Sequence, residues 1–90
     1  MNITFDPAKR AKTLEERGLD FADADQVFAS VAYTIEDDRL PYPEPRFITF
    51  GMLAERLVMV VWTPMPDGRR IISMRKANDR EQARYRDRVG

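Results

Sequence analysis

The sequence predicts an α+β fold, in which two N-terminal helices lie on an antiparallel sheet and a third helix follows the last strand, in the order β-α-α-β-β-β-α. Its apolar residues recur with a helical period before Ser30, and they alternate with polar residues between Val31 and Met74. Stretches rich in proline and glycine separate the segments. At 90 residues the chain is expected to form a single domain over residues 1–90, with a core small enough that a partner could supply part of it.

The N-terminal third of the chain carries clear helix signals. Residues 3–5 alternate as a short first strand. Asp6 then caps a helix that has Pro7 at its first position and ends at Gly18. Asp20 caps a second helix. The apolar stripe of this second helix consists of Phe21, Ala24, Val27 and Phe28.

Strand-like sequence follows the helices. It covers Val31–Ile35, Arg46–Met52, Leu57–Thr63 and Arg69–Arg75, with a turn at Ala54-Glu55. The segment Leu40–Pro45 has a proline at every second position, which a sheet ladder does not tolerate, so it is expected to be an extended loop. Residues 57–62 are apolar on both faces and therefore predict a central strand.

A last helix is predicted after Asn78. Glu81 stands at the third helical position and would complete a capping box with Asn78. The apolar surface of this helix is small, chiefly Tyr85 and Val89, so a ligand or a partner protein would help to explain why it is present. A stripe of like charges at spacing four is formed by Arg80, Arg84 and Arg88.

Composition excludes several classes of function. The chain has no cysteine and no histidine, which removes disulfide frameworks, the usual zinc sites and Cys–His or Ser–His–Asp catalysis. It has no stretch of 18 apolar residues and no signal-peptide pattern, so we expect a cytoplasmic protein without a membrane segment.

The net charge of zero conceals a strong polarity. Residues 1–44 contain five basic and ten acidic side chains, whereas residues 45–90 contain ten basic and five acidic ones. Twelve of the 15 cations are arginine, which favours bidentate contacts with phosphate or carboxylate groups. The second half is therefore the candidate anion-binding half, and the alternative is a solvated surface that happens to be segregated.

The run from Arg69 to Tyr85 combines a strand, basic residues at its end, a helix start and a tyrosine, and this combination points toward RNA. RNA cleavage through its own 2′-hydroxyl needs charge neutralisation and proton transfer but no metal. We predict that Arg46 and Arg75 clamp the transition state. The proton-transfer candidates are Lys76, Tyr85 and Glu81. Residues expected to position backbone phosphates are Arg70 and Arg80, and Tyr85 could instead stack a base.

Each candidate also has a plain structural interpretation. Arg75, expected on the sheet face of Ile71 and Ser73, could cap a sheet edge or pair with Asp79. Tyr85 could be the core anchor of its helix and Glu81 only a helix cap. Lys9 could be a solvated charge early in the first helix.

Several short motifs extend over nearly the whole chain. They are Phe5-Asp6-x-x-Lys9, Gly18-x-x-Phe21, Ala24-x-x-Val27-Phe28, Glu44-x-Arg46-Phe47, Val61-x-Thr63 and Arg70-Ile71-Ile72-Ser73-x-Arg75-Lys76-Ala77, followed by Glu81 and Tyr85. In these motifs the chain resembles the BrnT toxins, which are RelE-superfamily ribonucleases of type II toxin–antitoxin systems. The last long motif is the most specific.

The resemblance implies a RelE-like fold and an endoribonuclease that uses no cofactor. It adds Lys9, which matches the family pattern, to the candidate RNA-binding residues. It also implies a neutralising BrnA-like ribbon-helix-helix antitoxin in a two-plus-two complex, with DNA contacted only through the antitoxin.

Two other functions remain open on the sequence. One is a protein-binding or RNA-binding module that keeps the fold without catalysis, as the absent histidine and the zero net charge would allow. The other is a metabolic enzyme acting on a small anion, which the lack of a glycine-rich phosphate loop disfavours.

Overall fold

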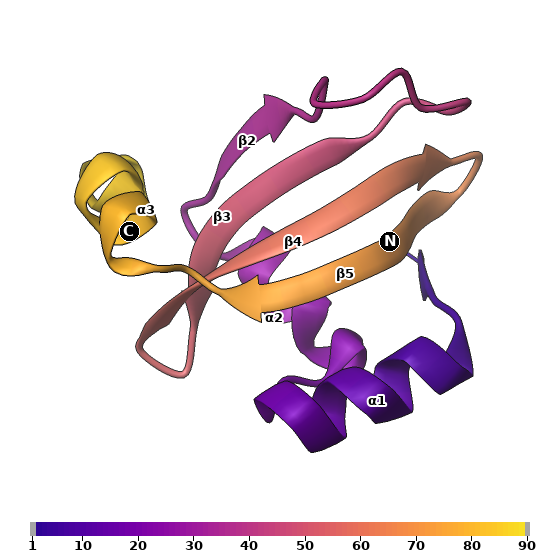
Figure 1. Cartoon of the computed structure of the whole chain (residues 1–90), viewed down its shortest axis with the longest axis horizontal. Helices are drawn as coiled ribbons and strands as arrows, with labels where there is room; N and C mark the ends of the chain where they lie inside the picture. Colours follow the sequence, from indigo (N-terminus) through magenta and orange to yellow (C-terminus); the bar gives the residue numbers. More distant parts are fainter. Residues whose placement is uncertain (1, 90) are drawn as a thin grey trace.

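A five-stranded sheet with the strand order β1-β5-β4-β3-β2 dominates the computed structural model, which describes residues 2–89 (Figure 1). The strands are β1 (Asn2–Thr4), β2 (Tyr33–Glu36), β3 (Phe47–Leu53), β4 (Arg56–Met65) and β5 (Gly68–Lys76). The helices are α1 (Pro7–Arg17), α2 (Ala24–Ala29) and α3 (Asp79–Tyr85), with 3₁₀ turns at Phe21–Asp23 and Arg86–Arg88. The predicted α+β class is confirmed.

The predicted element order and sheet type were wrong in two respects. Four strands follow the helices, at the four strand-like segments predicted, so the order β-α-α-β-β-β-α was one strand short. The sheet is mixed rather than antiparallel, because β1 pairs in parallel with β5, from Asn2 opposite Gly68 to Thr4 opposite Arg70. This pairing depends on a close approach at Gly68, where a Cβ atom would lie 1.9 Å from the carbonyl oxygen of Asn2.

The predicted helix signals are present. The Asp6 side chain accepts a hydrogen bond from the backbone N–H of Ala8 at 2.9 Å, and Gly18 ends α1 with φ of 68°. Asp20 caps the 3₁₀ turn, so the second α-helix begins only at Ala24. Asn78 and Glu81 form the expected capping box of α3.

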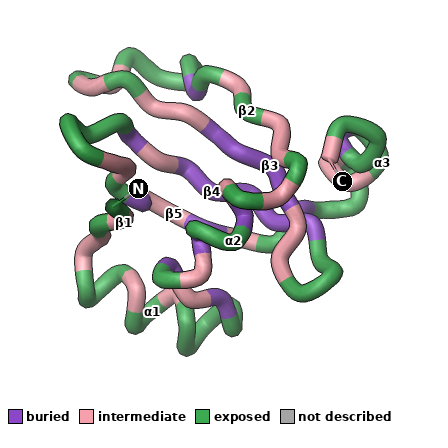
Figure 2. The backbone as a smooth tube through the Cα atoms, turned by 180° about the vertical axis from the view of Figure 1, so that it is seen from behind, coloured by how far each residue is buried: buried purple, intermediate pink, exposed green. Residues whose placement is uncertain are grey.

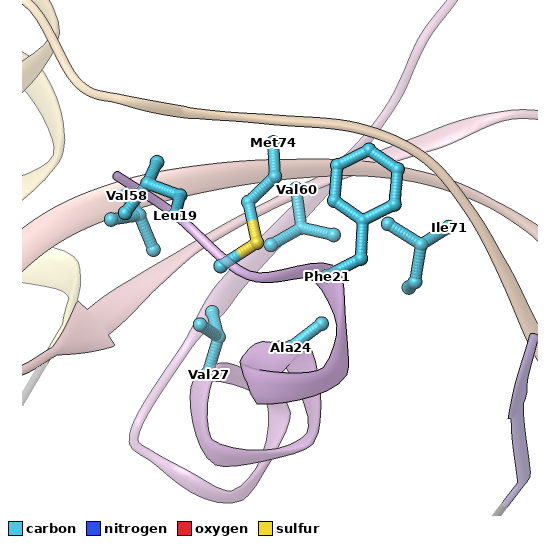
Figure 3. Close-up of a cluster of buried hydrophobic side chains, with 8 residues drawn as sticks. All are labelled: Leu19, Phe21, Ala24, Val27, Val58, Val60, Ile71 and Met74. Carbon is cyan, nitrogen blue, oxygen red and sulfur yellow. The ribbon is translucent and has the colours of Figure 1, made fainter. Parts of the chain in front are cut away.

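The largest core lies between the sheet and the N-terminal helical segments. It consists of Leu19, Phe21, Ala24, Val27, Val58, Val60, Ile71 and Met74 (Figure 3). Helix α2 approaches β3 closely because Gly51 has no side chain; a Cβ atom there would lie 2.8 Å from Cγ1 of Val27. We call this side of the sheet the covered face.

The opposite side of the sheet carries a second cluster, to which α3 contributes. Its buried members are Ile48, Phe50, Leu57, Met59, Val61, Ala77 and Tyr85. Figure 2 shows burial concentrated in the central strands, with α1 and much of α3 exposed. Because α3 is short and crosses only one end of the strands (Figure 1), we call this side the open face. No helix among the described residues is long and apolar enough to cross a membrane.

Candidate anion-binding site

A cavity of about 200 Å³ lies on the open face beside α3. Its apolar lining comes from the strands, through Ile35, Ile48, Phe50 and Met59. Its polar lining consists of Arg39, Arg75, Arg80, Arg84, Glu81 and Tyr85. Four guanidinium groups and one carboxylate therefore surround an apolar floor, and this lining favours an anionic ligand.

A β-bulge at Ile72 sets the direction of the basic side chains on β5. Met59 and Thr63 are four residues apart in β4, so their side chains point to the same face of the sheet. Thr63 lies opposite Arg70 and Met59 lies opposite Arg75. A regular strand would direct residues five apart to opposite faces, but the register shift at Ile72 brings both arginines to the open face. The expectation that Ile71 shares the face of Arg75 was wrong, because Ile71 packs in the covered core.

Arg75 forms a bidentate ion pair with Glu81. Its Nη1 and Nη2 atoms donate to the two carboxylate oxygens at 2.7 and 2.8 Å. The alternative pairing with Asp79 was wrong, because Glu81 at the third helical position points back toward β5. Hydrogen bonding from Arg75 lowers the pKa of Glu81, so this carboxylate is a weaker base than an ordinary glutamate.

Tyr85 anchors α3 on the open face. Its ring stacks on Phe50 with a centroid distance of 4.1 Å and lies 5.5 Å from the ring of Tyr33, and the residue is only 9% exposed. The structural interpretation of Tyr85 is confirmed. Tyr85 also lines the cavity, so an anchoring role and a functional role are compatible.

Arg80 and Arg84 project from α3 at the cavity edge. Both are exposed, and neither has a carboxylate within 4.0 Å among the residues that the structure describes. The third arginine of the predicted stripe behaves differently, because Arg88 lies in the 3₁₀ turn and donates to the Tyr33 hydroxyl at 2.9 Å. The two α3 arginines are thus available for an anionic ligand, with Arg84 lying over the Tyr85 ring at 5.4 Å from its centroid.

Arg39 is the cavity residue that sequence reasoning missed. It comes from the loop after β2 and forms a bidentate pair with Asp37, at 2.6 and 2.8 Å. An available signal was that Arg39 is the single basic residue between Glu36 and Glu44, a segment with four acidic residues.

The other predicted residues lie outside this cavity. Arg46 pairs with Glu44 at 2.9 Å and stacks over Tyr42 at 4.0 Å, at the start of β3. Arg70 is exposed on the open face. Lys76 lies opposite Val58 and lines a second cavity with Asp20 and Asp23 on the covered side. Lys9 is exposed on α1.

The remaining side chains offer no metal centre within residues 2–89, where no group of three or more histidine, cysteine, aspartate or glutamate residues could hold an ion. The positive groups in the lining of the described cavity are arginines.

A comparison with protein-family models identifies the chain. The model of the BrnT ribonuclease toxins of type II toxin–antitoxin systems matches residues 5–81, which is most of the sequence. No curated protein matches the chain. The chain belongs to the BrnT family.

Proposed function

We propose that this BrnT-family toxin is an endoribonuclease that cleaves RNA through the 2′-hydroxyl group, without a metal, at the arginine-lined cavity of the open face. The family consists of ribonuclease toxins. The observation that carries the proposal is the convergence of Arg75, Arg80 and Arg84 with Tyr85 around one cavity.

The arginines would supply electrostatic stabilisation. Cleavage at phosphorus adds negative charge to the transition state, and fixed guanidinium groups placed around it lower the barrier. Arg75 lies on the sheet, whereas Arg80 and Arg84 project from α3, so a phosphate in the cavity would be contacted from two sides. Arg75 must share or exchange its Glu81 partner when the phosphate binds.

Proton transfer would fall to Tyr85, whose side chain lines the same cavity. Glu81 is the weaker candidate because its pKa is lowered by Arg75. Lys76 is the next residue after Arg75 but belongs to the other face, and it is the second candidate. Arg70 on the open face and Arg46 just before β3 would hold neighbouring phosphates. Lys9 on α1 would contact RNA only beyond the sheet.

A BrnA-like ribbon-helix-helix antitoxin is the proposed partner in the cytoplasm. A type II system implies a protein antitoxin. We propose a two-plus-two complex in which antitoxin covers the basic open face, DNA being bound through the antitoxin alone, and a RelE-like topology for the toxin. The exposed arginines of α3 support a carboxylate-rich antitoxin surface at this place.

A non-catalytic binding module is the second candidate function. It is favoured by the bidentate Arg75–Glu81 pair, which already occupies the best-placed arginine. Such a module would bind RNA or protein through the same face without turnover.

The purified protein and a single-stranded RNA distinguish these functions. We expect Arg75→Ala to slow cleavage by about a hundredfold or more, because one oriented charge donor is lost. Arg10→Ala is a matched control, since Arg10 forms the same kind of pair with Asp20 away from the cavity. Equal cleavage by wild type and Arg75→Ala would place the site elsewhere, and binding without cleavage by wild type would favour the module.

A further inference from the structure

Asp37 has an unusual place in the molecule. Among the described residues it is the one buried charged residue, and its side chain is 0% exposed. It nevertheless belongs to a surface loop between β2 and β3. A buried carboxylate is costly unless a cation and hydrogen bonds compensate it, so this position needs a reason.

Most of the compensation comes from Arg39 of the same loop, and the charge of Arg46 adds a smaller part. Arg39 donates from Nε and Nη2 to the two oxygens of Asp37, and this contact lowers the pKa of the carboxyl group. The loop itself is held at its base. The Asp37 N–H donates to the Arg46 carbonyl at 2.8 Å, and the Thr63 hydroxyl donates to the Pro45 carbonyl at 2.6 Å. The Asp37 carboxylate, held by this anchored loop, thus fixes the orientation of the Arg39 guanidinium.

Part of the Arg39 guanidinium is available, although Tyr42 lies within reach of it as well. A guanidinium has five N–H donors, and the pair with Asp37 uses two of them. The side chain is 58% exposed and lines the same cavity as Arg75, Arg80 and Arg84. It reaches the cavity from the loop that follows β2, whereas Tyr33 at the start of β2 contacts Tyr85 of α3. Arg39 and the α3 arginines therefore line one cavity from separate elements of the fold.

We infer that Arg39 binds an RNA backbone phosphate in this cavity and that the buried Asp37 is the residue that positions it. This inference rests on the proposed function. Together with the α3 arginines, Arg39 completes a clamp whose two sides come from separate elements. A guanidinium held by a buried carboxylate loses little side-chain freedom on binding, so its contact with phosphate costs less entropy than that of a free arginine.

The test uses RNA that the toxin cannot cleave. Single-stranded RNA methylated at every 2′-oxygen retains its phosphates but lacks the attacking hydroxyl group, so affinity can be measured at several salt concentrations. The variant is Asp37→Asn/Arg39→Gln, which avoids leaving a buried carboxylate without its cation. Its matched control is Asp20→Asn/Arg10→Gln, because that pair has the same Nε and Nη2 geometry, at 2.7 and 3.0 Å, but lies outside the cavity.

We expect the Asp37/Arg39 variant to bind about tenfold more weakly and to reduce the slope of log affinity against log salt by about 0.7, the value for one lost phosphate contact on a single strand. The Asp20/Arg10 control should match wild type in both. Asp37→Asn alone should weaken binding while its slope stays near wild type, because the charge of Arg39 remains but its orientation is lost. A merely structural role would lower the melting temperature and leave both binding readouts unchanged.

Arg75→Ala distinguishes failure of this inference from failure of the proposed function. If Arg75→Ala weakens binding and the Asp37/Arg39 variant retains the wild-type affinity and slope, the role of Arg39 is refuted while the cavity stands. If both variants bind like wild type, the cavity itself is not the RNA site and both proposals fall.

Discussion

The two faces of the sheet use the same strands for different purposes. On the covered face, Phe21, Val60 and Met74 belong to an apolar cluster sealed by the N-terminal segments. On the open face, α3 covers only one end of the strands, and arginines surround the apolar surface next to it. Successive side chains of a strand point to opposite faces. One face of the sheet can therefore bury the apolar residues that stabilise the fold, while the other face carries charged residues.

The largest expected effect lies on the covered face. Phe21 is 1% exposed and packs among aliphatic side chains, so Phe21→Ala should lower the free energy of unfolding by about 3–5 kcal/mol. Denaturant unfolding followed by circular dichroism measures this loss. A loss below about 1 kcal/mol would show that the covered face does not carry the stability.

Removing the hydroxyl group of Tyr85 on the open face should have a smaller effect on stability. Tyr85→Phe keeps the ring that stacks on Phe50, so stability should change by less than about 1 kcal/mol. Cleavage should nevertheless slow at least about tenfold if the hydroxyl group transfers a proton. Lys76→Ala, assayed in parallel, identifies the proton donor: unchanged cleavage by Tyr85→Phe together with a slow Lys76→Ala would assign that role to Lys76.

A change in the turn between β3 and β4 should alter the stability of the whole sheet without altering the cavity on the open face. Ala54 and Glu55 have φ values of 49° and 63°, as a two-residue hairpin turn demands, although neither is a residue that favours positive φ. Replacing the pair with Asn-Gly should raise the free energy of unfolding by about 1 kcal/mol and leave RNA cleavage unchanged, since the turn is not part of the cavity lining. Thermal unfolding and the cleavage assay together check this, and an altered cleavage rate would count against separate faces.

Acid should weaken an ion pair on each face. The hydrogen bonds from Arg10 hold the pKa of Asp20 at about 2, and Arg75 lowers that of Glu81. A lowered pKa in the folded state stabilises the protein above the ordinary values of 3.8 and 4.5, respectively, and this stabilisation is lost as pH falls through the folded value.

Variants of the two carboxylates separate these contributions. Glu81→Gln should remove up to about 1 kcal/mol of the acid-dependent loss of stability, because the pair is partly exposed. Asp20→Asn should reduce the loss as well, chiefly below pH about 4. Only Glu81→Gln should also change RNA cleavage. Unfolding free energies measured from pH 6 to pH 2 would contradict this if neither variant differs from wild type.

Local signals made the helices and most strands predictable. The caps at Asp6, Gly18 and Asn78 depend on residues a few positions away, and strand alternation depends on immediate neighbours. The parallel pairing of Asn2 with Gly68 was not predicted, because a three-residue strand chooses its partner by tertiary packing. Local sequence signals therefore predict which helices and strands form, but they do not predict which strand the short β1 pairs with.

The candidate site was predictable only in part. Arg75, Arg80 and Tyr85 line one cavity because β5 leads directly into α3, which the sequence shows. The bulge at Ile72 carries no glycine or proline signal, so the shared face of Arg70 and Arg75 could not be derived. Arg39 was missed because its direction depends on a buried carboxylate in a loop whose path the prolines do not specify.

The most direct test of the division between the faces is an NMR titration of the wild-type protein with 2′-O-methylated single-stranded RNA. We predict that the backbone amide signals of the open-face cavity, at Arg39, Arg75 and residues 80–85, shift with the added RNA. Signals of α1 and α2 should stay unchanged, because neither helix lines the cavity and α2 packs in the covered core. Shifts concentrated in α1 and α2, with the cavity signals unmoved, would contradict the assignment of RNA binding to the open face.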